Sequence, residues 1–476
     1  MGHRKQQKRV EETIGMLAAA GLFIVLLSLT AALIMMFLTS SSESETFDLE
    51  QVTADRTKST VDLNGYFLPE FAGIITDGTG RGISSSAGIA AEIFRMSAPA
   101  LSELMAVECF RGEISEEEWL LLAGESDSVY FRLHERTPLS LLSLFAGLYS
   151  GNDTGIAVQG YACEVLVLPY RESEQYESGM MRAAVRDSDG KNLLFAKTAP
   201  RYVLTAEDLE QTAESYYASL YDFVFAGNSC NASSPTEPVF TEPVSFRNII
   251  ITGDTASLIG ETETESILRI FEINPDKLLS AHTEADGTHT YVDSQGVLYI
   301  RQSEIAYRST SDSGIHTEDL VPAVWDTVAH TLESYIAASA ELWNRLCAAG
   351  RMYTGEDADV ILSSVSSSGT SVTVRFAYVM DNLRIMTGCP AMEAEFENGR
   401  LRSLTVHTIA VMNMGTRGES ADERWFFRTL TGAAPDNVTL VYRNSYSPAY
   451  SVDYSTDAVA AEWAALTVAS AQKEGN

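Results

Sequence analysis

The first pattern along the chain is a long apolar segment near its N-terminus. Ile14–Leu38 reads IGMLAAAGLFIVLLSLTAALIMMFL, 25 residues without a charge. About 20 apolar residues are enough for a helix to cross a ~30 Å hydrocarbon core. Basic residues precede this run and acidic residues follow it, and the positively charged flank of a membrane helix stays in the cytoplasm. We therefore expect a cytoplasmic basic tail (1–13), a single transmembrane helix (14–38) and a large part of the chain outside.

A cleaved signal peptide is the alternative interpretation of this run. Signal peptides have apolar cores of about 7–15 residues and a small-residue cleavage site. The run is longer than that, and no clear A-x-A pattern follows it. No Cys stands just after it, which disfavours a bacterial lipoprotein anchor. The pattern favours an uncleaved anchor in the cell membrane.

Small residues recur along one face of the predicted membrane helix. Ala18, Gly21, Ser28 and Ala32, with Val25 among them, follow alternating steps of three and four. Small side chains let another helix approach closely, and a Ser hydroxyl can form a hydrogen bond across the contact. We predict that this stripe contacts a partner helix. Because Ala and Gly are common in any membrane helix, the stripe alone leaves both interpretations open.

Beyond the helix, segments of helical period alternate with segments of strand period. This mixture predicts an α+β fold in which helices pack on curved antiparallel sheets. The polar stretch 39–64 is interpreted as a stalk, and the remainder is too long for one ordinary domain. We expect two or three outer domains, with boundaries at 65–202, 203–314 and 315–476.

Turn signals place several strands within these domains. Residues 180–198 predict two strands around an Asp-Gly turn. Asn398-Gly399 is a strong hairpin signal between two further strands. The Gly-rich stretch 77–88 lacks the ending of a phosphate-binding loop and is interpreted as a flexible turn before a helix.

Three helices are predicted from apolar spacing and capping residues. One in the first domain is interrupted at Pro99, and a long one covers 318–349. Another begins at Thr205, with Asp208 in place of the usual Glu of a capping box. Its expected buried face consists of Leu209, Tyr216, Leu220 and Phe223.

Net charge excludes one class of function. The total of -32 includes +2 from the tail, which leaves about -34 for the part beyond the membrane helix. Such a field repels phosphate backbones, whose binding needs dense Lys and Arg. No nucleic-acid partner is therefore expected.

A search for chemistry finds no catalytic, metal or cofactor motif. The five Cys are widely spaced and form no C-x-x-C pair, so buried thiols are favoured, with one disulfide left open. The seven His show no metal-ligand spacing. No nucleophile elbow or S-x-x-K occurs. Acidic pairs are abundant, but a glycosidase pair is defined by the fold and not by sequence. We predict a protein without enzyme activity or cofactor.

Two segments carry residues of a known pattern. Residues 268–309 hold an Asn-Pro after a short helix, an acidic-Gly turn, a Tyr strand, a Gly turn and a final Tyr. Residues 374–408 hold a Phe-x-Tyr strand followed by a strand pair around an Asn-Gly turn. The matching residues are Asn274, Pro275, Asp286, Gly287, Tyr291, Gly296, Tyr307, Phe376, Tyr378 and Gly399.

These segments resemble the YycH family of extracytoplasmic regulators, and more loosely their YycI companions. The resemblance assigns a YycH-like character to residues 203–314 and 315–476. Two departures are visible: residues 302–304 stand where a Gly turn is common, and the Gly and Pro expected after the Phe-x-Tyr strand are displaced to Gly388 and Pro390. The matching residues are strand and turn positions, so they point to a scaffold.

The resemblance implies a regulator in the membrane of a Gram-positive type bacterium. Such proteins modulate a sensor histidine kinase of the WalK/YycG type, which controls cell-wall metabolism, through transmembrane and outer-domain contacts, together with a YycI-like companion. Two other interpretations stay open. One is an outer-surface binding module for lipid, peptide or peptidoglycan, and the other is a hydrolase of wall polymers.

Overall fold

The computed structural model describes the chain from Leu63 to Leu466 with internal gaps, and these residues belong to one compact unit, 58–476. The predicted tail, membrane helix and most of the stalk lie outside the described residues, and so do Ala18, Gly21, Ser28 and Ala32. Among the helices that are described, none has the length and apolarity to span a membrane. The gaps are 126, 151–159, 172–178, 188–189, 199, 226–236, 254–258, 302, 311–313, 321–331, 351–357, 422, 424–436 and 444–460.

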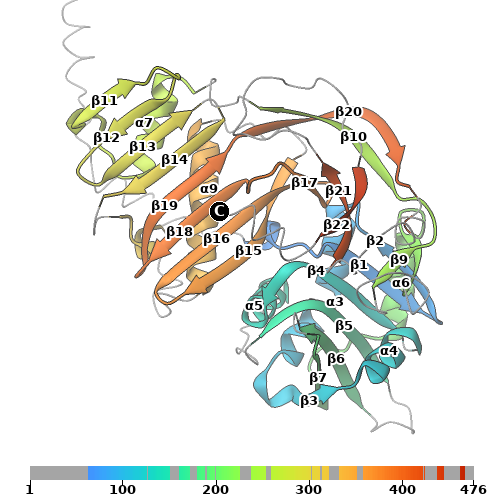
Figure 1. Ribbon diagram of the computed structural model, residues 1–476. Coiled ribbons are helices and arrows are strands. Elements are labelled where there is room, and N and C mark those ends of the chain that lie inside the picture. The colour runs from blue at the N-terminus through green and yellow to red at the C-terminus, as the bar shows by residue number, and fades with distance from the viewer. Residues whose placement is uncertain are drawn as a thin grey trace, which may run out of the picture. The chain divides into compact units, whose positions relative to one another are not determined.

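The first half of this unit forms a nine-stranded sheet with the order β3-β7-β6-β5-β4-β1-β2-β8-β9 (Figure 1). Every neighbouring pair in it is antiparallel. Its strands are β1 (Phe71–Thr76), β2 (Thr79–Ile83), β3 (Phe110–Ile114), β4 (Ser128–Pro138), β5 (Tyr161–Arg171), β6 (Met180–Asp187), β7 (Asn192–Thr198), β8 (Tyr221–Phe225) and β9 (Pro238–Phe240). The helices with it are η1 (Leu63–Tyr66), α3 (Ala87–Leu104), η2 (Val107–Cys109), α4 (Glu116–Glu125), α5 (Leu139–Ser150) and α6 (Ala206–Ser215).

One face of this sheet is apolar and is covered by α3 and α5. Phe131 of β4 meets Phe94 of α3 with ring centroids 5.3 Å apart. Phe67, just after η1, stacks on Phe145 of α5 at 4.2 Å. Burying one such side chain stabilises the fold by roughly 1.5–3 kcal/mol. The helices are therefore fixed to the sheet by aromatic packing.

The second half forms an eleven-stranded sheet and a two-stranded ribbon. The sheet order is β11-β12-β13-β14-β19-β18-β16-β17-β21-β22, with β15 also paired to β16, and the ribbon joins β10 to β20 (Figure 1). The strands are β10 (Ser245–Gly253), β11 (Ser280–Thr283), β12 (His289–Val292), β13 (Gly296–Arg301), β14 (Glu304–Ser309), β15 (Ala358–Ser368), β16 (Ser371–Met380), β17 (Leu383–Met386), β18 (Met392–Glu397), β19 (Arg400–His407), β20 (Ile409–Glu419), β21 (Asn437–Arg443) and β22 (Ala461–Leu466). The helices are α7 (Glu261–Ile270), η5 (Pro275–Lys277), α8 (Thr317–Leu320) and α9 (Leu332–Gly350).

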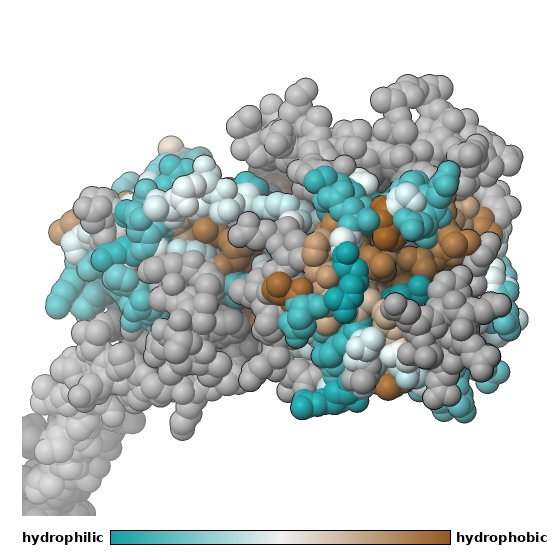
Figure 2. All heavy atoms as spheres, turned by 90° about the horizontal axis from the view of Figure 1, so that it is seen from below, coloured by the Kyte–Doolittle hydropathy of each residue, from teal (hydrophilic) through white to brown (hydrophobic). Residues whose placement is uncertain are grey.

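Helix α9 packs on the eleven-stranded sheet through aromatic side chains. Its Tyr335 meets Phe396 of β18 at 5.1 Å, and its Trp343 meets Tyr378 of β16 at 6.0 Å. Hydrophobic residues also reach the surface: a view from below shows them beside hydrophilic ones (Figure 2). Such mixing is usual, because a folded chain has too little polar surface to cover itself.

The mixed fold is confirmed, with strands dominant, and one detail of it is wrong. We expected antiparallel sheets, but β17 and β21 pair in parallel. Strands β8 and β9, which belong to the predicted domain 203–314, join the nine-stranded sheet, while β14 of that domain pairs with β19 of the next. The division into three domains stays a prediction.

Two predicted helices have different bounds in the structure. Helix α3 continues through Pro99 to Leu104, because burial of its later residues outweighs the hydrogen bond that Pro removes. Helix α6 begins with the predicted capping box of Thr205 and Asp208 but ends at Ser215. Phe223, which we expected on the buried face of this helix, belongs to strand β8 and is buried there.

The structure also differs from the prediction at residues 77–88 and 318–349. The stretch 77–88 is not a flexible turn, since it contains strand β2, which pairs with β1. The long helix predicted over 318–349 is described as α8 and α9, with 321–331 between them outside the described residues.

Candidate functional site

Strand β4 presents polar residues on one face and apolar residues on the other. Tyr130 and Arg132 alternate with Phe131 and Leu133, and side chains alternate between the two faces of a strand. Such alternation usually marks a strand with one face in water. Here both faces are buried, because Tyr130 also packs against Phe71 of β1 and Phe225 of β8. The polar face of β4 is therefore enclosed.

A row of charges crosses the enclosed face from strand to strand. Arg132 of β4 lies opposite Glu164 of β5, which lies opposite Arg186 of β6, which lies opposite Asn192 of β7. Their relative exposures are 7%, 8%, 6% and 3%. Directly opposed residues of unlike charge attract one another. The alternation of sign among the three charged side chains lets them share a buried surface with the neutral amide of Asn192.

The far end of the row is closed by helix α4. Nε of Arg186 donates to Oδ1 of Asn192 at 2.9 Å, and its Nη2 donates to Glu116 of α4 at 2.5 Å. The guanidinium also lies 5.1 Å from the ring centre of Trp119. Burial by itself would lower the pKa of Arg186, but the carboxylates of Glu164 and Glu116 outweigh it and raise that pKa. Arg186 thus stays charged inside the fold.

The near end of the row is what we call the Arg132 cluster, made of Arg132, Glu70 and Glu237. Arg132 lies 3.4 Å from the Glu70 carboxylate, just before β1, and 3.7 Å from that of Glu237, just before β9. Burial opposes the charge of Arg132, yet the two carboxylates outweigh this effect and raise its pKa. The cluster joins three segments that are far apart in sequence.

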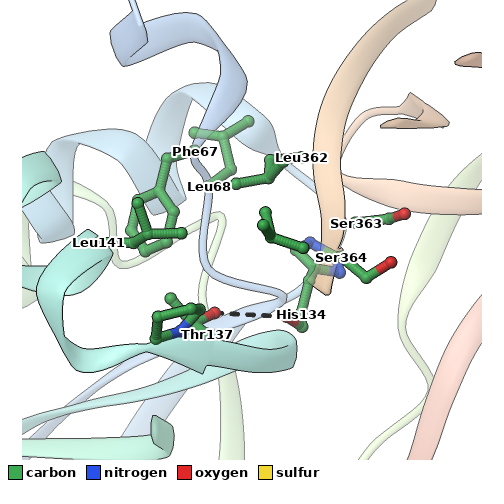
Figure 3. A pocket seen from close by; sticks show the side chains of 10 residues that line it. Phe67, Leu68, His134, Thr137, Leu141, Leu362, Ser363 and Ser364 are labelled. Atoms are coloured by element: carbon green, nitrogen blue, oxygen red, sulfur yellow. Dashed lines mark hydrogen bonds between the residues drawn. The ribbon is translucent and has the colours of Figure 1, made fainter. Parts of the chain in front are cut away.

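Beyond Arg132, a bulge redirects strand β4. Its pairing with β5 passes from Arg132 opposite Glu164 to Thr137 opposite Ala162, so β4 has extra residues there. Bulges bend a strand and change the direction of its side chains. His134 and Thr137 consequently line a small cavity beside β15 (Figure 3).

This junction cavity lies between the two sheets. Its volume of about 10 Å³ is close to that of one enclosed water molecule. Phe67, Leu68 and Leu141 lie on one side of it and β15 on the other (Figure 3). Its lining residues are Phe67, Leu68, His134, Thr137, Pro138, Leu141, Leu362, Ser363, Ser364 and Val365.

Two hydrogen bonds tie the same region to the eleven-stranded sheet and to helix α9, which packs on it. Tyr66 donates its hydroxyl to Oδ1 of Asn344 in α9 at 2.6 Å. Nδ2 of Asn382, in the turn between β16 and β17, donates to the carbonyl of Pro69 at 2.9 Å. The segment 63–70 therefore connects the Arg132 cluster, the cavity and the second sheet.

His134 is the titratable group of the cavity. Burial lowers its pKa to about 4; Glu70 works against that shift, and Arg384 and Arg132 reinforce it. Its Nε2 is buried and has no hydrogen-bond partner in the described part of the chain. A neutral imidazole at neutral pH follows, and a single water is a suitable partner for it.

We predict that acid weakens the fold through His134. The unfolded pKa is near 6.5 and the folded pKa about 4, so the unfolded state takes up the proton first as pH falls. The contribution is complete above pH 6.5 and is lost as pH falls toward 4, by at most about 3 kcal/mol. The free energy of unfolding, measured by urea denaturation, should fall less between pH 7 and pH 4.5 in His134→Gln than in the unchanged protein. The exposed His282→Gln serves as the control, and equal pH dependence in both variants would contradict this assignment.

The described residues of the site show no arrangement typical of catalysis or metal binding. No group of three His, Cys, Asp or Glu side chains among them is placed to hold a metal ion. Among the described residues, Cys109, Cys163, Cys347 and Cys389 form no disulfide with one another. Burial raises the pKa of Cys163 and of Cys347 to about 12 in each case, which leaves these thiols protonated. The junction is best described as a charged and hydrogen-bonded connection between two sheets.

Comparison with known proteins gives a relationship at the level of fold. No protein-family model matches the chain, and no curated protein matches it in sequence. A crystal structure of YycH from Bacillus subtilis matches it with a TM-score of 0.51, at 10% sequence identity. The match covers 82% of this chain and 95% of that one. The chain has the YycH fold.

The residues that suggested YycH from sequence are turn and core positions of this fold. Asn274 Oδ1 accepts from the amide of Asp276 at 2.9 Å, and Pro275 begins η5. Asp286 Oδ1 accepts from the amide of Thr288 at 2.9 Å, beside Gly287 at a φ of 87°. These contacts hold the turns on either side of β11.

Gly296 and Tyr307 meet within the YycH-like hairpins. A Cβ on Gly296 would lie 2.6 Å from Cε2 of Tyr307, so only Gly fits there. Tyr307 is buried and stacks on Phe271, the residue just after α7, at 4.6 Å. Tyr291 of β12 is half-buried, and burial raises its pKa. The pair Gly296 and Tyr307 fixes the strands against α7.

Phe376 and Tyr378 anchor the central strand of the second sheet. Phe376 meets Tyr66 at 5.4 Å, and the Tyr378 hydroxyl donates to the carbonyl of His407 at 2.7 Å. Asn398 and Gly399 turn the chain between β18 and β19 with φ values of 50° and 75°. None of the signature residues lines the junction cavity.

The residues of the junction had little signal in the sequence. His134 is one of several scattered His in the sequence, and no motif marks Arg132. The alternation of apolar and polar residues in VYFRLH, residues 129–134, indicates a strand. It does not distinguish a solvent-exposed polar face from a buried one. Enclosure comes from β8, β9 and the second sheet, which are distant in sequence.

Proposed function

We propose that this chain is a membrane-anchored, extracytoplasmic and non-enzymatic regulator of a sensor histidine kinase of the WalK/YycG type. The observation that carries the proposal is the YycH fold, shared over 82% of this chain and 95% of the YycH chain. The resembling segments 268–309 and 374–408 support it from sequence. A YycI-like companion and the lipid bilayer are the other partners that we propose.

Regulation without an enzyme site requires differential contacts. A partner shifts a two-state equilibrium only by the difference in its binding energy to the two states. The stripe Ala18, Gly21, Ser28 and Ala32 would supply such contacts inside the membrane. The outer part would add contacts whose geometry depends on the junction at Arg132 and His134. The activity of the kinase would thus depend on the geometry that the junction gives to the outer part.

The binding-module alternative lacks a specific observation in its favour. It predicts a large apolar pocket, whereas the junction cavity has the volume of about one water molecule.

Bulky residues in the small-residue stripe should weaken association with the kinase. Gly21→Leu and Ser28→Leu would separate two closely packed helices, and we expect co-purification of the kinase from membranes to fall at least about fivefold, equivalent to about 1 kcal/mol. Ala19→Leu, on the opposite face of a helix of 3.6 residues per turn, is the matched control. If the outer part without its membrane helix binds and regulates the kinase fully, contact through the helix is excluded.

A further inference from the structure

One edge of the eleven-stranded sheet differs from other sheet edges of the molecule. Strand β11 ends the sheet, and of the strands that the structure describes only β12 pairs with it (Figure 1). All four of its residues, Ser280–Thr283, are exposed. An edge strand presents unpaired amide and carbonyl groups and is a template for another strand. Its surroundings decide whether that template is blocked.

Two other edges carry the usual protection. Strand β3 has alternating charges, Arg111 and Glu113, and a bulge after Phe110. Strand β9 begins at Pro238 and is buried, and the amide of Phe240 is taken by a Glu423 carboxylate at 2.7 Å. Charges, bulges, Pro and coverage are the devices by which proteins prevent edge pairing.

Strand β11 has none of these devices. It contains no Asp, Glu, Lys, Arg or Pro, and its register with β12 is regular throughout. The adjacent Leu279 is 72% exposed, the largest value among the exposed large hydrophobic residues that the structure describes. A second strand on this edge would both complete the hydrogen bonding and cover Leu279.

The charges around this edge indicate what kind of strand fits. Asp276 and Lys277 precede β11, and Glu284 and Asp286 follow it, so acidic residues are in excess. The chain as a whole carries -32. A second copy would bring the same negative charge to the contact and is disfavoured by repulsion. A partner with Lys or Arg beside its strand gains from charge complementarity.

We propose that β11 is a docking edge for an extended, positively charged segment of a partner protein. The segment adds a strand beside Ser280–Thr283 through main-chain hydrogen bonds, the mode known as β-augmentation. Its basic side chains lie next to Glu284 and Asp286, and an apolar side chain covers Leu279. This surface goes beyond the proposed kinase regulation, since neither the membrane helix nor the junction takes part in it.

The pairing pattern identifies a backbone group that such a segment would use. The amide of Glu284 donates to the carbonyl of Thr288 at 2.8 Å, which marks a hydrogen-bonded pair at the turn. Hydrogen-bonded and non-hydrogen-bonded pairs alternate along an antiparallel ladder. Ala281, opposite Tyr291, therefore directs its amide away from β12 and toward the free edge.

The test uses the full-length protein in detergent and a labelled eight-residue peptide of alternating Lys and Val, followed by fluorescence anisotropy. We expect binding, together with slower hydrogen exchange at residues 279–283. The same peptide with alternate backbone nitrogens methylated should bind at least about tenfold more weakly, because it loses about two hydrogen bonds. A peptide of alternating Glu and Val should also bind at least about tenfold more weakly.

Variants of the protein locate the contact. Ala281→Pro removes the outward amide and should weaken peptide binding at least about tenfold, whereas Glu113→Pro on the protected edge β3 should leave it unchanged. Equal binding of the methylated or the acidic peptide would overturn the proposal, as would protection at another segment. Protection of 279–283 that rises with protein concentration without peptide would assign the edge to a second copy instead.

Discussion

Replacing Arg132 by methionine is expected to lower the free energy of unfolding by about 3–5 kcal/mol, the usual cost of removing one partner from a buried ion pair. The substitution removes the cation that lies beside both buried carboxylates, Glu70 and Glu237. Because methionine keeps much of the side-chain volume, the decrease in the free energy of unfolding reflects the lost charge more than lost packing. Urea unfolding of the full-length protein, followed by tryptophan fluorescence, measures the effect.

A matched control separates this effect from the general loss of an arginine. Arg95 forms an exposed pair with Glu92 at 2.8 Å on α3, and exposed pairs contribute at most about 1 kcal/mol. Arg95→Met should therefore change the unfolding free energy only slightly. If Arg132→Met is as mild as Arg95→Met, the Arg132 cluster does not hold the three segments together.

Truncating Tyr307 to alanine is expected to cost about 3–5 kcal/mol, as for other large buried aromatic residues. Its ring is buried against Phe271 and fills the space above Gly296. Its hydroxyl is buried without a hydrogen-bond partner in the described structure, and burial raises its pKa to about 12. Removing only that hydroxyl should remove the desolvation cost of a polar group that gains no hydrogen bond in return.

Tyr307→Phe is therefore the informative companion. We expect it to leave stability unchanged or to raise it by about 1 kcal/mol, since the ring and its stacking on Phe271 are kept. A clear loss in Tyr307→Phe would mean that the hydroxyl has a partner in solution, such as an ordered water. Both variants can be compared by urea midpoint at neutral pH, where the hydroxyl stays protonated.

Local rules predicted those parts of the fold that depend on neighbouring residues. Asn398-Gly399 forms the hairpin turn because both residues take a positive φ, and Thr205 with Asp208 forms the capping box through reciprocal hydrogen bonds. The Asp-Gly turn between the strands of 180–198 follows the same logic, since Gly190 has a φ of 81°. In each case the energetic cause lies within four residues.

The elements that depended on distant partners could not be predicted. Phe223 was assigned to a helix, because its apolar spacing suits either a helix or a strand; pairing of β8 with β2, about 140 residues earlier, decided the outcome. The parallel pairing of β17 with β21 has the same cause. Arg132 and His134 look like solvent-facing residues until β9 and β15 enclose them. The junction is therefore visible only in the structure.

Reconstitution of the sensor kinase in nanodiscs, with and without the full-length chain, tests the central claim most directly. The initial rate of kinase autophosphorylation is the measurement. We expect the chain to change this rate, Gly21→Leu to reduce the change, and Ala19→Leu to preserve it. A rate that is the same with and without the chain, in the presence of the YycI-like companion as well, would contradict the proposed function.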